Sequence, residues 1–192
     1  GRVRFVGAAR DRSRGDYLRI LRFFRFSARF AQDFDETGLA ACADEKAGVA
    51  RLSAERVGDE LSKILALPRA PFAVEAMNRL GILAEVWPAP ARLDAFAGLK
   101  RLASDAPAPL GLAALWGESG EGVDAALRLS NADAARRRAA LKAAAMLSPE
   151  TGRRAGRVVY HRCGKRAFRD GALIAAARGA GEAFLTRMTR LA

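Results

Sequence analysis

The spacing of apolar residues is the feature that most constrains the fold of this chain. From Arg14 onward, apolar residues recur at the three- and four-residue intervals of α-helices. The opening stretch RVRFVG differs, because Arg2 and Arg4 alternate with Val3 and Phe5, a pattern typical of a strand. No apolar run approaches the ~20 residues of a membrane-spanning helix. The sequence therefore predicts an all-α fold behind a short N-terminal strand remnant.

Capping residues and prolines set the predicted helix limits. Ser53 begins one helix, which stops before Pro68, and Pro71 lies in the first turn of the next, which Gly81 caps. Asn131 is the expected N-cap of a long alanine-rich helix. The other ranges expected to be helical are 14–31, 36–46, 92–103, 109–117, 121–129, 131–147, 153–163 and 168–178.

The composition points to an anionic partner. The chain has 192 residues and a net charge of +12, almost all of it from arginine. The guanidinium fork matches phosphate oxygens, so a phosphate-bearing partner is favoured. Two distant cysteines, Cys42 and Cys163, and the single histidine His161 exclude a Cys/His zinc site and fit the reducing cytoplasm.

Residues 16–30, DYLRILRFFRFSARF, carry the strongest functional signal. On a helix their apolar side chains point to nearly every side, which predicts a buried helix. A polar stripe crosses it at three-residue steps: Asp16, Arg19, Arg22 and Arg25. Buried guanidiniums need anionic partners, and one aspartate cannot neutralise three arginines, so we expect the missing anion to be a ligand. A structural network of ion pairs is the alternative.

An aspartate and an arginine one helical turn apart could read a nucleobase. The carboxylate only accepts hydrogen bonds and the guanidinium only donates them. Cytosine and adenine each present an amino donor beside a ring-nitrogen acceptor, whereas guanine and uracil present the reverse pattern. Asp16 and Arg19 would therefore select C and A, which leaves Arg22 and Arg25 for phosphate or ribose oxygens.

Three segments resemble one known family. GDYLRILRFFRFSARF is similar to the neck-helix motif of class II tRNA nucleotidyltransferases, the CCA-adding enzymes and their bacterial poly(A) polymerase relatives. RLSAERVGDELSKILALP resembles the family's Ser-x-Glu-Arg helix, and MNRLGILAEVWP its Met-x-x-x-Gly-Leu-Leu segment. The resemblance is strong over residues 1–88 and looser after them.

The resemblance implies a domain organisation and a partner. Residues 1–15 would be a strand and connector from a missing α/β head, residues 16–90 a helical neck domain and residues 91–192 a helical body and tail. The neck would select the incoming ATP or CTP, and both helical domains would bind tRNA. Residue by residue, the family assigns nucleotide binding to Asp16, Arg19, Arg22 and Arg25. It assigns support of that pocket to Ser53, Glu55 and Arg56.

The sequence departs from the family at the catalytic parts. Gly15 stands where the family has a glutamate that orients the Asp/Arg pair. The family's metal-binding Asp-x-Asp has one lookalike, Asp33-Phe34-Asp35, which we interpret as a turn or helix cap. No catalytic or metal-binding residue is therefore assigned in this chain. The Mg²⁺ implied by the family would be bound by the head, which is truncated, lost or separately encoded, and the chain alone should be inactive.

Two basic clusters are candidates for an RNA surface. They comprise Arg136, Arg137, Arg138, Lys142, Arg153, Arg154 and Arg157. Solvated helix faces are the alternative interpretation. The leading hypothesis is thus the helical part of a CCA-adding or poly(A)-polymerase-type enzyme in the cytoplasm, without a membrane partner. A non-catalytic RNA-binding helical module is the second hypothesis, and a purely structural helical domain is the third.

Overall fold

The computed structural model describes Val3 and residues 16–191. These residues form helices and loops without a strand, so the predicted all-α class is confirmed for this part of the chain. The strand expected at residues 2–7 lies, apart from Val3, outside the described residues. Over the described ranges, no helix has both the length and the apolar character needed to cross a bilayer.

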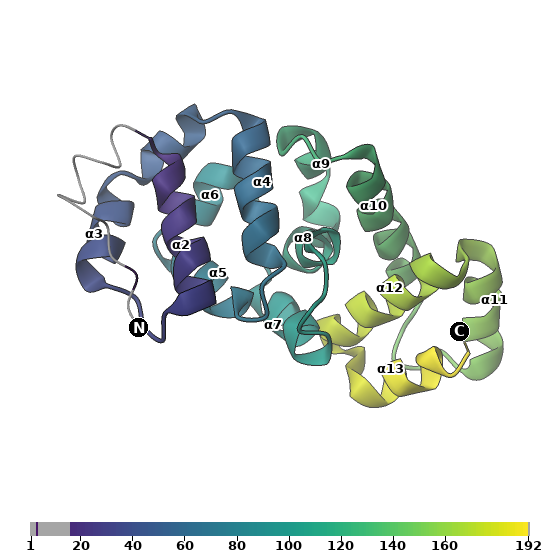
Figure 1. Cartoon of the computed structure of the whole chain (residues 1–192). Coiled ribbons are helices and arrows are strands. Elements are labelled where there is room, and N and C mark those ends of the chain that lie inside the picture. Colours follow the sequence, from purple (N-terminus) through teal and green to yellow (C-terminus); the bar gives the residue numbers. More distant parts are fainter. Residues whose placement is uncertain (1–2, 4–15, 192) are drawn as a thin grey trace. The chain divides into compact units, whose positions relative to one another are not determined.

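The helices form two compact units. The first contains the described residues up to Ala91 together with Gly122–Leu129, and the second contains Arg92–Glu121 and the described residues from Ser130 onward. In the first unit (Figure 1) the helices are α2 (Leu18–Phe30), α3 (Glu36–Asp44), the 3-10 helix η1 (Lys46–Arg51), α4 (Ala54–Leu65), α5 (Ala70–Arg79), α6 (Ile82–Val86) and α9 (Val123–Ala126).

Local signals fix the ends of several of these helices. The Ser53 hydroxyl accepts a hydrogen bond from the Arg56 amide at 3.4 Å, which confirms the predicted cap of α4. Asp35 caps α3 by accepting from the Gly38 amide at 3.0 Å, as expected for a helix cap. Gly81 has a φ of 76° between α5 and α6, a left-handed conformation that favours glycine.

The core of the first unit lies where α2 packs against α4 and α5. Phe24 is fully buried, and its ring meets that of Phe34 edge-on at 5.6 Å. Phe34 in turn stacks on Phe72 of α5 at 4.2 Å. Gly58 of α4 approaches the backbone of Leu127 so closely that a Cβ would lie 2.1 Å from its carbonyl oxygen. This contact fastens residues 122–129 to the first unit.

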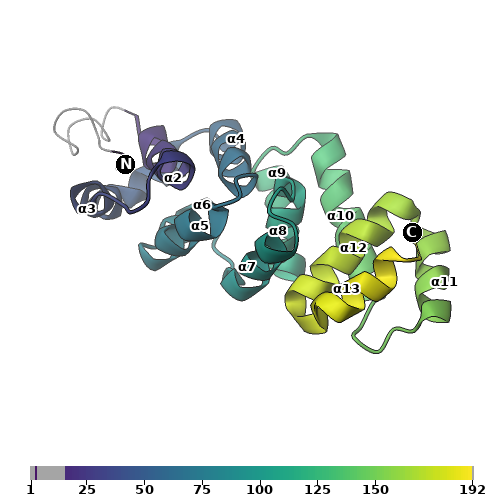
Figure 2. The ribbon, with the colours of Figure 1, turned by 60° about the horizontal axis from the view of Figure 1, so that its bottom comes forward.

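The second unit is a bundle built around α12 (Figure 2). Its helices are α7 (Leu93–Leu102), α8 (Ala108–Trp116), the 3-10 helix η2 (Gly117–Gly120), α10 (Asn131–Ala145), α11 (Arg153–Cys163), α12 (Lys165–Ala175), the π-helical turn η3 (Ala176–Ala180) and α13 (Gly181–Thr189). Gly171 lets α12 approach α10, because a Cβ there would lie 2.5 Å from that of Ala143. Phe168 and Phe184 are buried in the core between α11, α12 and α13.

One predicted helix cap in this unit is wrong, and one helix is missing from the prediction. Ser130 rather than Asn131 caps α10, since the Ser130 hydroxyl accepts from the Asp133 amide at 3.1 Å. Helix α13 lies beyond the last predicted helix. Gly179, with a φ of 127°, and Gly181, with a φ of 80°, interrupt the regular helix before α13. The two glycines indicate the end of a helix in the sequence, but they do not indicate that another helix follows.

Candidate functional site

Asp16 lies directly before α2 and is held by contacts from two elements. Its Oδ1 accepts a hydrogen bond from the Leu18 amide at 3.2 Å and another from Nη2 of Arg56, on α4, at 2.9 Å. The side chain of Asp16 is one-third exposed. Since both bonds go to Oδ1, Oδ2 remains an available acceptor with respect to the described residues. Arg56 thus positions the carboxylate and leaves it accessible.

Arg19 follows one turn later, and its side chain is exposed. Among residues 16–191 no hydrogen bond or ion pair engages its guanidinium, although its backbone amide donates to the Asp16 carbonyl at 3.0 Å. Asp16 therefore offers an accessible acceptor, and Arg19 an exposed donor, within one turn at the start of α2.

The prediction that this helix is buried on all sides is wrong. Leu18, Ile20 and Phe24 face the core, but Arg22 is exposed, as are 39% of Phe26 and 61% of Phe30. Helices α4 and α5 pack against α2 and cover its buried face. The arginine stripe lies mostly on the open face, so desolvation alone does not demand an anionic ligand there.

Glu60 supplies an anion that the sequence analysis missed. It projects from α4, its side chain is 3% exposed, and its Oε2 lies 2.8 Å from Nε of Arg25. Its Oε1 lies 3.5 Å from Nε of Arg22 and 3.9 Å from Nζ of Lys63. A buried carboxylate is costly unless it is paired, and these three cations compensate it. Arg22 and Arg25 therefore have an anionic partner within the protein, which corrects the expectation that a ligand supplies their missing anion.

A spacing signal for Glu60 exists in the sequence. Ser53, Arg56, Glu60 and Lys63 recur at three- and four-residue steps, which places them near one another on α4. Arg56 thereby contacts Asp16 at the start of the polar stripe, and Glu60 contacts Arg22 and Arg25 at its end. Glu55 points elsewhere and forms an exposed ion pair with Arg128 at 3.7 Å. Of the predicted supporting residues, the structure brings Arg56 to Asp16, while Ser53 caps the helix that carries Arg56.

The basic residues of the second unit fall into different environments. Arg136 is paired with Asp170 through two hydrogen bonds of 2.8 and 3.0 Å, which raise the pKa of this guanidinium. Arg137 is 3% exposed and donates to the carbonyls of Gly117 and Gly120 at 3.1 and 2.9 Å. Arg137 is therefore part of the interior and cannot belong to the predicted RNA surface.

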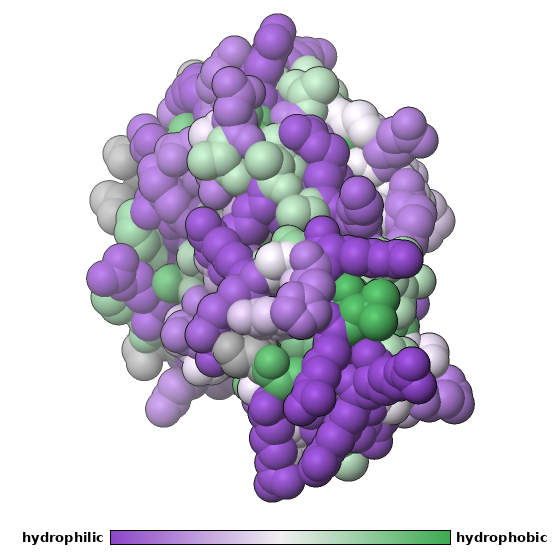
Figure 3. All heavy atoms as spheres, turned by 90° about the vertical axis from the view of Figure 1, so that its right-hand side faces the viewer, coloured by the Kyte–Doolittle hydropathy of each residue, from purple (hydrophilic) through white to green (hydrophobic). Residues whose placement is uncertain are grey.

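The remaining candidates of that cluster are on the surface. The predicted cations that are exposed on α10 and α11 are Arg138, Lys142, Arg153, Arg154 and Arg157, and Arg162 of α11 is exposed as well. Over the described part of the chain, no ion pair neutralises Arg153, Arg154 or Arg157. Figure 3, seen from the side of α11, shows long hydrophilic side chains. The exposed arginines make the surface of α11 basic.

Other reactive groups offer no second site. Cys42 is fully buried, and burial raises the pKa of its thiol to about 12, so it does not provide a thiolate. Among the described residues, no group of three or more His, Cys, Asp or Glu side chains could hold a metal ion. The Mg²⁺ implied by the resemblance does not fit any carboxylate cluster in residues 16–191.

Comparisons with known proteins concern the sequence family and the fold. Residues 33–93 match the family model described as "Probable RNA and SrmB- binding site of polymerase A". The fold resembles that of the Bacillus stearothermophilus CCA-adding enzyme crystallised with CTP, with a TM-score of 0.73 and 21% identity over 99% of this chain and 50% of that one. The chain thus shares the fold of about half of that enzyme.

Curated relatives with similar sequences are CCA-adding enzymes. Over 118 residues the chain is 38% identical to the mitochondrial CCA tRNA nucleotidyltransferase 1 of Mus musculus. This alignment covers 59% of this chain and 27% of the mouse protein. Over 81 residues it is 35% identical to the CCA-adding enzyme of Streptococcus sanguinis, covering 42% of this chain and 20% of that enzyme. The chain is therefore similar, over part of its length, to class II CCA-adding enzymes. The matched segments span about a fifth to a quarter of the length of these relatives.

Proposed function

We propose that this chain selects the incoming nucleotide and binds the RNA acceptor in a CCA-adding type of nucleotidyl transfer. The observation that carries the proposal is the pair at the start of α2. Asp16 is fixed by Arg56 at 2.9 Å, and Arg19 lies exposed one turn away. The similarity to CCA-adding enzymes and the matched segment at residues 33–93 support the same assignment.

The proposed selection works through hydrogen-bond polarity. Oδ2 of Asp16 would accept from the exocyclic amino group of cytosine or adenine, and Arg19 would donate to the adjacent ring nitrogen. Guanine and uracil would place a carbonyl against the carboxylate and a ring N–H against the guanidinium, and both contacts are repulsive. Arg22, which is half exposed beside Glu60, is free to turn one side of its fork to a phosphate or ribose oxygen.

The proposed partners are tRNA, ATP and CTP. Transfer of the nucleotidyl group needs Mg²⁺, which stabilises the charge on the phosphates, and we assign its ligands to a head domain rather than to the described residues. In this scheme the present chain recognises the base and holds the RNA. The unpaired arginines of α11 would contact the RNA backbone.

Isothermal titration of the full chain with each of four nucleotides tests the proposal. We expect CTP and ATP to bind, and GTP and UTP to bind at least ten-fold more weakly. Asp16→Ala should weaken CTP binding about ten-fold or more, because a hydrogen bond to a charged group is lost. Asp59→Ala, at an exposed acid of α4, is the matched control and should leave binding unchanged. Equal affinity for all four nucleotides, or no effect of Asp16→Ala, contradicts the proposal.

The second hypothesis, a non-catalytic RNA-binding module, is favoured by one observation. The α11 face keeps its exposed arginines independently of the Asp16 pair, because the two lie in separate units. Binding of tRNA that weakens with salt, in a chain that binds none of the four nucleotides, would support this function instead.

A further inference from the structure

The exposed face of α2 carries two aromatic rings that the nucleotide pocket does not use. Phe26 and Phe30 are, with Val158, the large hydrophobic residues exposed in the described part of the chain. Their ring centroids lie 6.3 Å apart with an interplanar angle of 21°, so the rings form one stacked apolar surface. An exposed aromatic pair of this kind has no role in the core of the unit.

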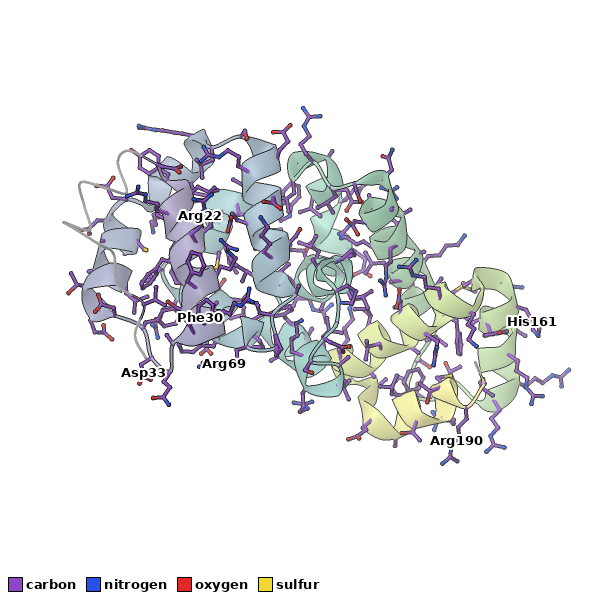
Figure 4. The ribbon with its side chains drawn as sticks, viewed as in Figure 1. Arg22, Phe30, Asp33, Arg69, His161 and Arg190 are labelled. Atoms are coloured by element: carbon purple, nitrogen blue, oxygen red, sulfur yellow. The ribbon has the colours of Figure 1, made fainter. Side chains whose placement is uncertain are left out.

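Arginines surround this surface. The guanidinium carbon of Arg25 lies 4.5 Å from the centre of the Phe26 ring, and that of Arg29 lies 5.3 Å from the centre of the Phe30 ring. Arg22 lies one turn before Phe26, and Arg69 donates to the carbonyl of Gln32 just past the end of α2. Figure 4 shows Arg22 and Phe30 along α2, with Arg69 near the latter.

The rings align with the nucleotide-reading arginine. At about 100° per residue, Arg19, Phe26 and Phe30 lie within about 40° of one another around the helix axis. With a rise of about 1.5 Å per residue, Phe26 lies roughly 10 Å beyond Arg19 along the helix. The same face therefore leads from the base-selecting pair to the aromatic surface.

We propose that Phe26 and Phe30 are a stacking platform for unpaired bases of a single-stranded RNA end. Stacked bases offer flat π surfaces to the rings, and their phosphates meet Arg22, Arg29 and Arg69. Glu60, which pairs with Arg22 and Arg25, is buried, and Asp33 is exposed beyond the end of the helix. An apolar protein partner would have to desolvate the guanidiniums without supplying anions, so the charge favours a nucleic acid.

This inference rests on the proposed function in one respect, namely that the RNA end approaches the Asp16 and Arg19 pair. The stacking site itself is defined by the rings and the arginines alone. Loss of nucleotide binding and loss of RNA binding are therefore separable measurements.

The test compares variants of the full chain in fluorescence-anisotropy titrations. The probe is a short, labelled single-stranded RNA that ends in cytidines, and the same sequence in a blunt duplex is the comparison. Phe26→Ala with Phe30→Ala should weaken single-strand binding about ten-fold or more and duplex binding little. Phe30→Trp should keep or improve binding. Pro88→Ala, at an exposed apolar residue away from both proposed RNA surfaces, is the control.

Two further readouts identify what the loss means. Removing rings does not remove charge, so the slope of log K against log salt should stay unchanged, whereas Arg29→Ala should reduce it. The CTP affinity of the double Phe variant should equal that of the unchanged protein. This result would show that the platform is separate from the nucleotide pocket. If CTP binds to no form of the protein while the Phe variants still bind RNA more weakly, the result contradicts the proposed function and supports the platform.

Three outcomes overturn the platform. The first is unchanged single-strand affinity in the double variant with its circular dichroism intact. The second is ultraviolet cross-linking of the RNA only to residues away from α2. The third is self-association of the unchanged chain that Phe26→Ala and Phe30→Ala abolish, because a second copy would then cover the rings.

Discussion

Arg56 of α4 reaches Asp16 in front of α2 and binds its carboxylate at 2.9 Å, with both side chains partly open to solvent. Half-exposed ion pairs of this kind contribute little to stability, about 0–1 kcal/mol. The contact fixes which way the carboxylate faces, because Oδ1 is occupied by Arg56 and by the Leu18 amide. The role of this ion pair is therefore to position Oδ2 of Asp16 as a hydrogen-bond acceptor.

Arg56→Ala should therefore separate nucleotide affinity from stability. We expect the dissociation constant for CTP to rise about five-fold, since Asp16 loses the partner that orients it, while the free energy of unfolding changes by less than about 1 kcal/mol. Calorimetric titration and urea denaturation measure the two effects. Arg79→Ala, at an exposed arginine of α5, is the control. A CTP affinity equal to that of the control variant would contradict the positioning role.

Glu60→Gln should destabilise the first unit. The substitution keeps the size of the side chain but removes the buried charge that faces Arg25 at 2.8 Å, and it leaves that half-buried guanidinium unpaired. We expect a loss of about 2–3 kcal/mol in the free energy of unfolding. Asp59→Asn is the matched control, since Asp59 is a 61% exposed partner of the same Lys63, and it should cost less than about 0.5 kcal/mol. Equal effects of the two variants in urea denaturation would show that Glu60 does not organise the arginines.

The sequence predicts what depends on neighbours along the chain. The limits of α4 follow from Ser53 and the proline after it, and the start of α5 follows from Pro71. The resemblance to CCA-adding enzymes also follows from local motifs. These features need no knowledge of which helix packs against which.

What the sequence does not predict depends on contacts between distant segments. The apolar residues of α2 suggest burial on all sides, but only the packing of α4 and α5 decides that Phe26 and Phe30 stay outside. The pairing of Glu60 with Arg25 joins residues far apart in the chain. Arg137 looks like its neighbour Arg138 in the sequence, and only the carbonyls of η2 make it an interior residue.

Lys100 predicts a pH dependence of stability in the second unit. It is 4% exposed on α7, its Nζ donates to the carbonyls of Ser104 and Ala106, and burial lowers its pKa from 10.5 to about 8. Between pH 8 and pH 10.5 the unfolded chain binds more protons at this group than the folded chain does. This group therefore makes the fold more stable as the pH rises through that range. Below pH 8 the charge is buried in the folded state and its full cost is present.

The comparison with Lys100→Met isolates that effect, because methionine has no proton to lose. The difference in unfolding free energy between the original chain and the variant should shift by about 1–3 kcal/mol in favour of the original between pH 7.5 and pH 10. Lys142→Met, at an exposed lysine of α10, should show no such shift. A constant difference across this range would show that Lys100 keeps an ordinary pKa.

The contrast between Arg137 and the arginines of α11 gives the last prediction. Arg137→Met removes two buried hydrogen bonds to the carbonyls of Gly117 and Gly120, so it should lower the free energy of unfolding by about 2–3 kcal/mol. Arg154→Met and Arg157→Met lie on an exposed face and should cost less than about 0.5 kcal/mol, but each should reduce the salt slope of tRNA binding by about one. Thermal denaturation and tRNA titrations over a range of salt concentrations measure both quantities for each variant. The assignment of α11 to the RNA surface fails if its variants leave the salt slope unchanged, and the interior role of Arg137 fails if its variant is as stable as theirs.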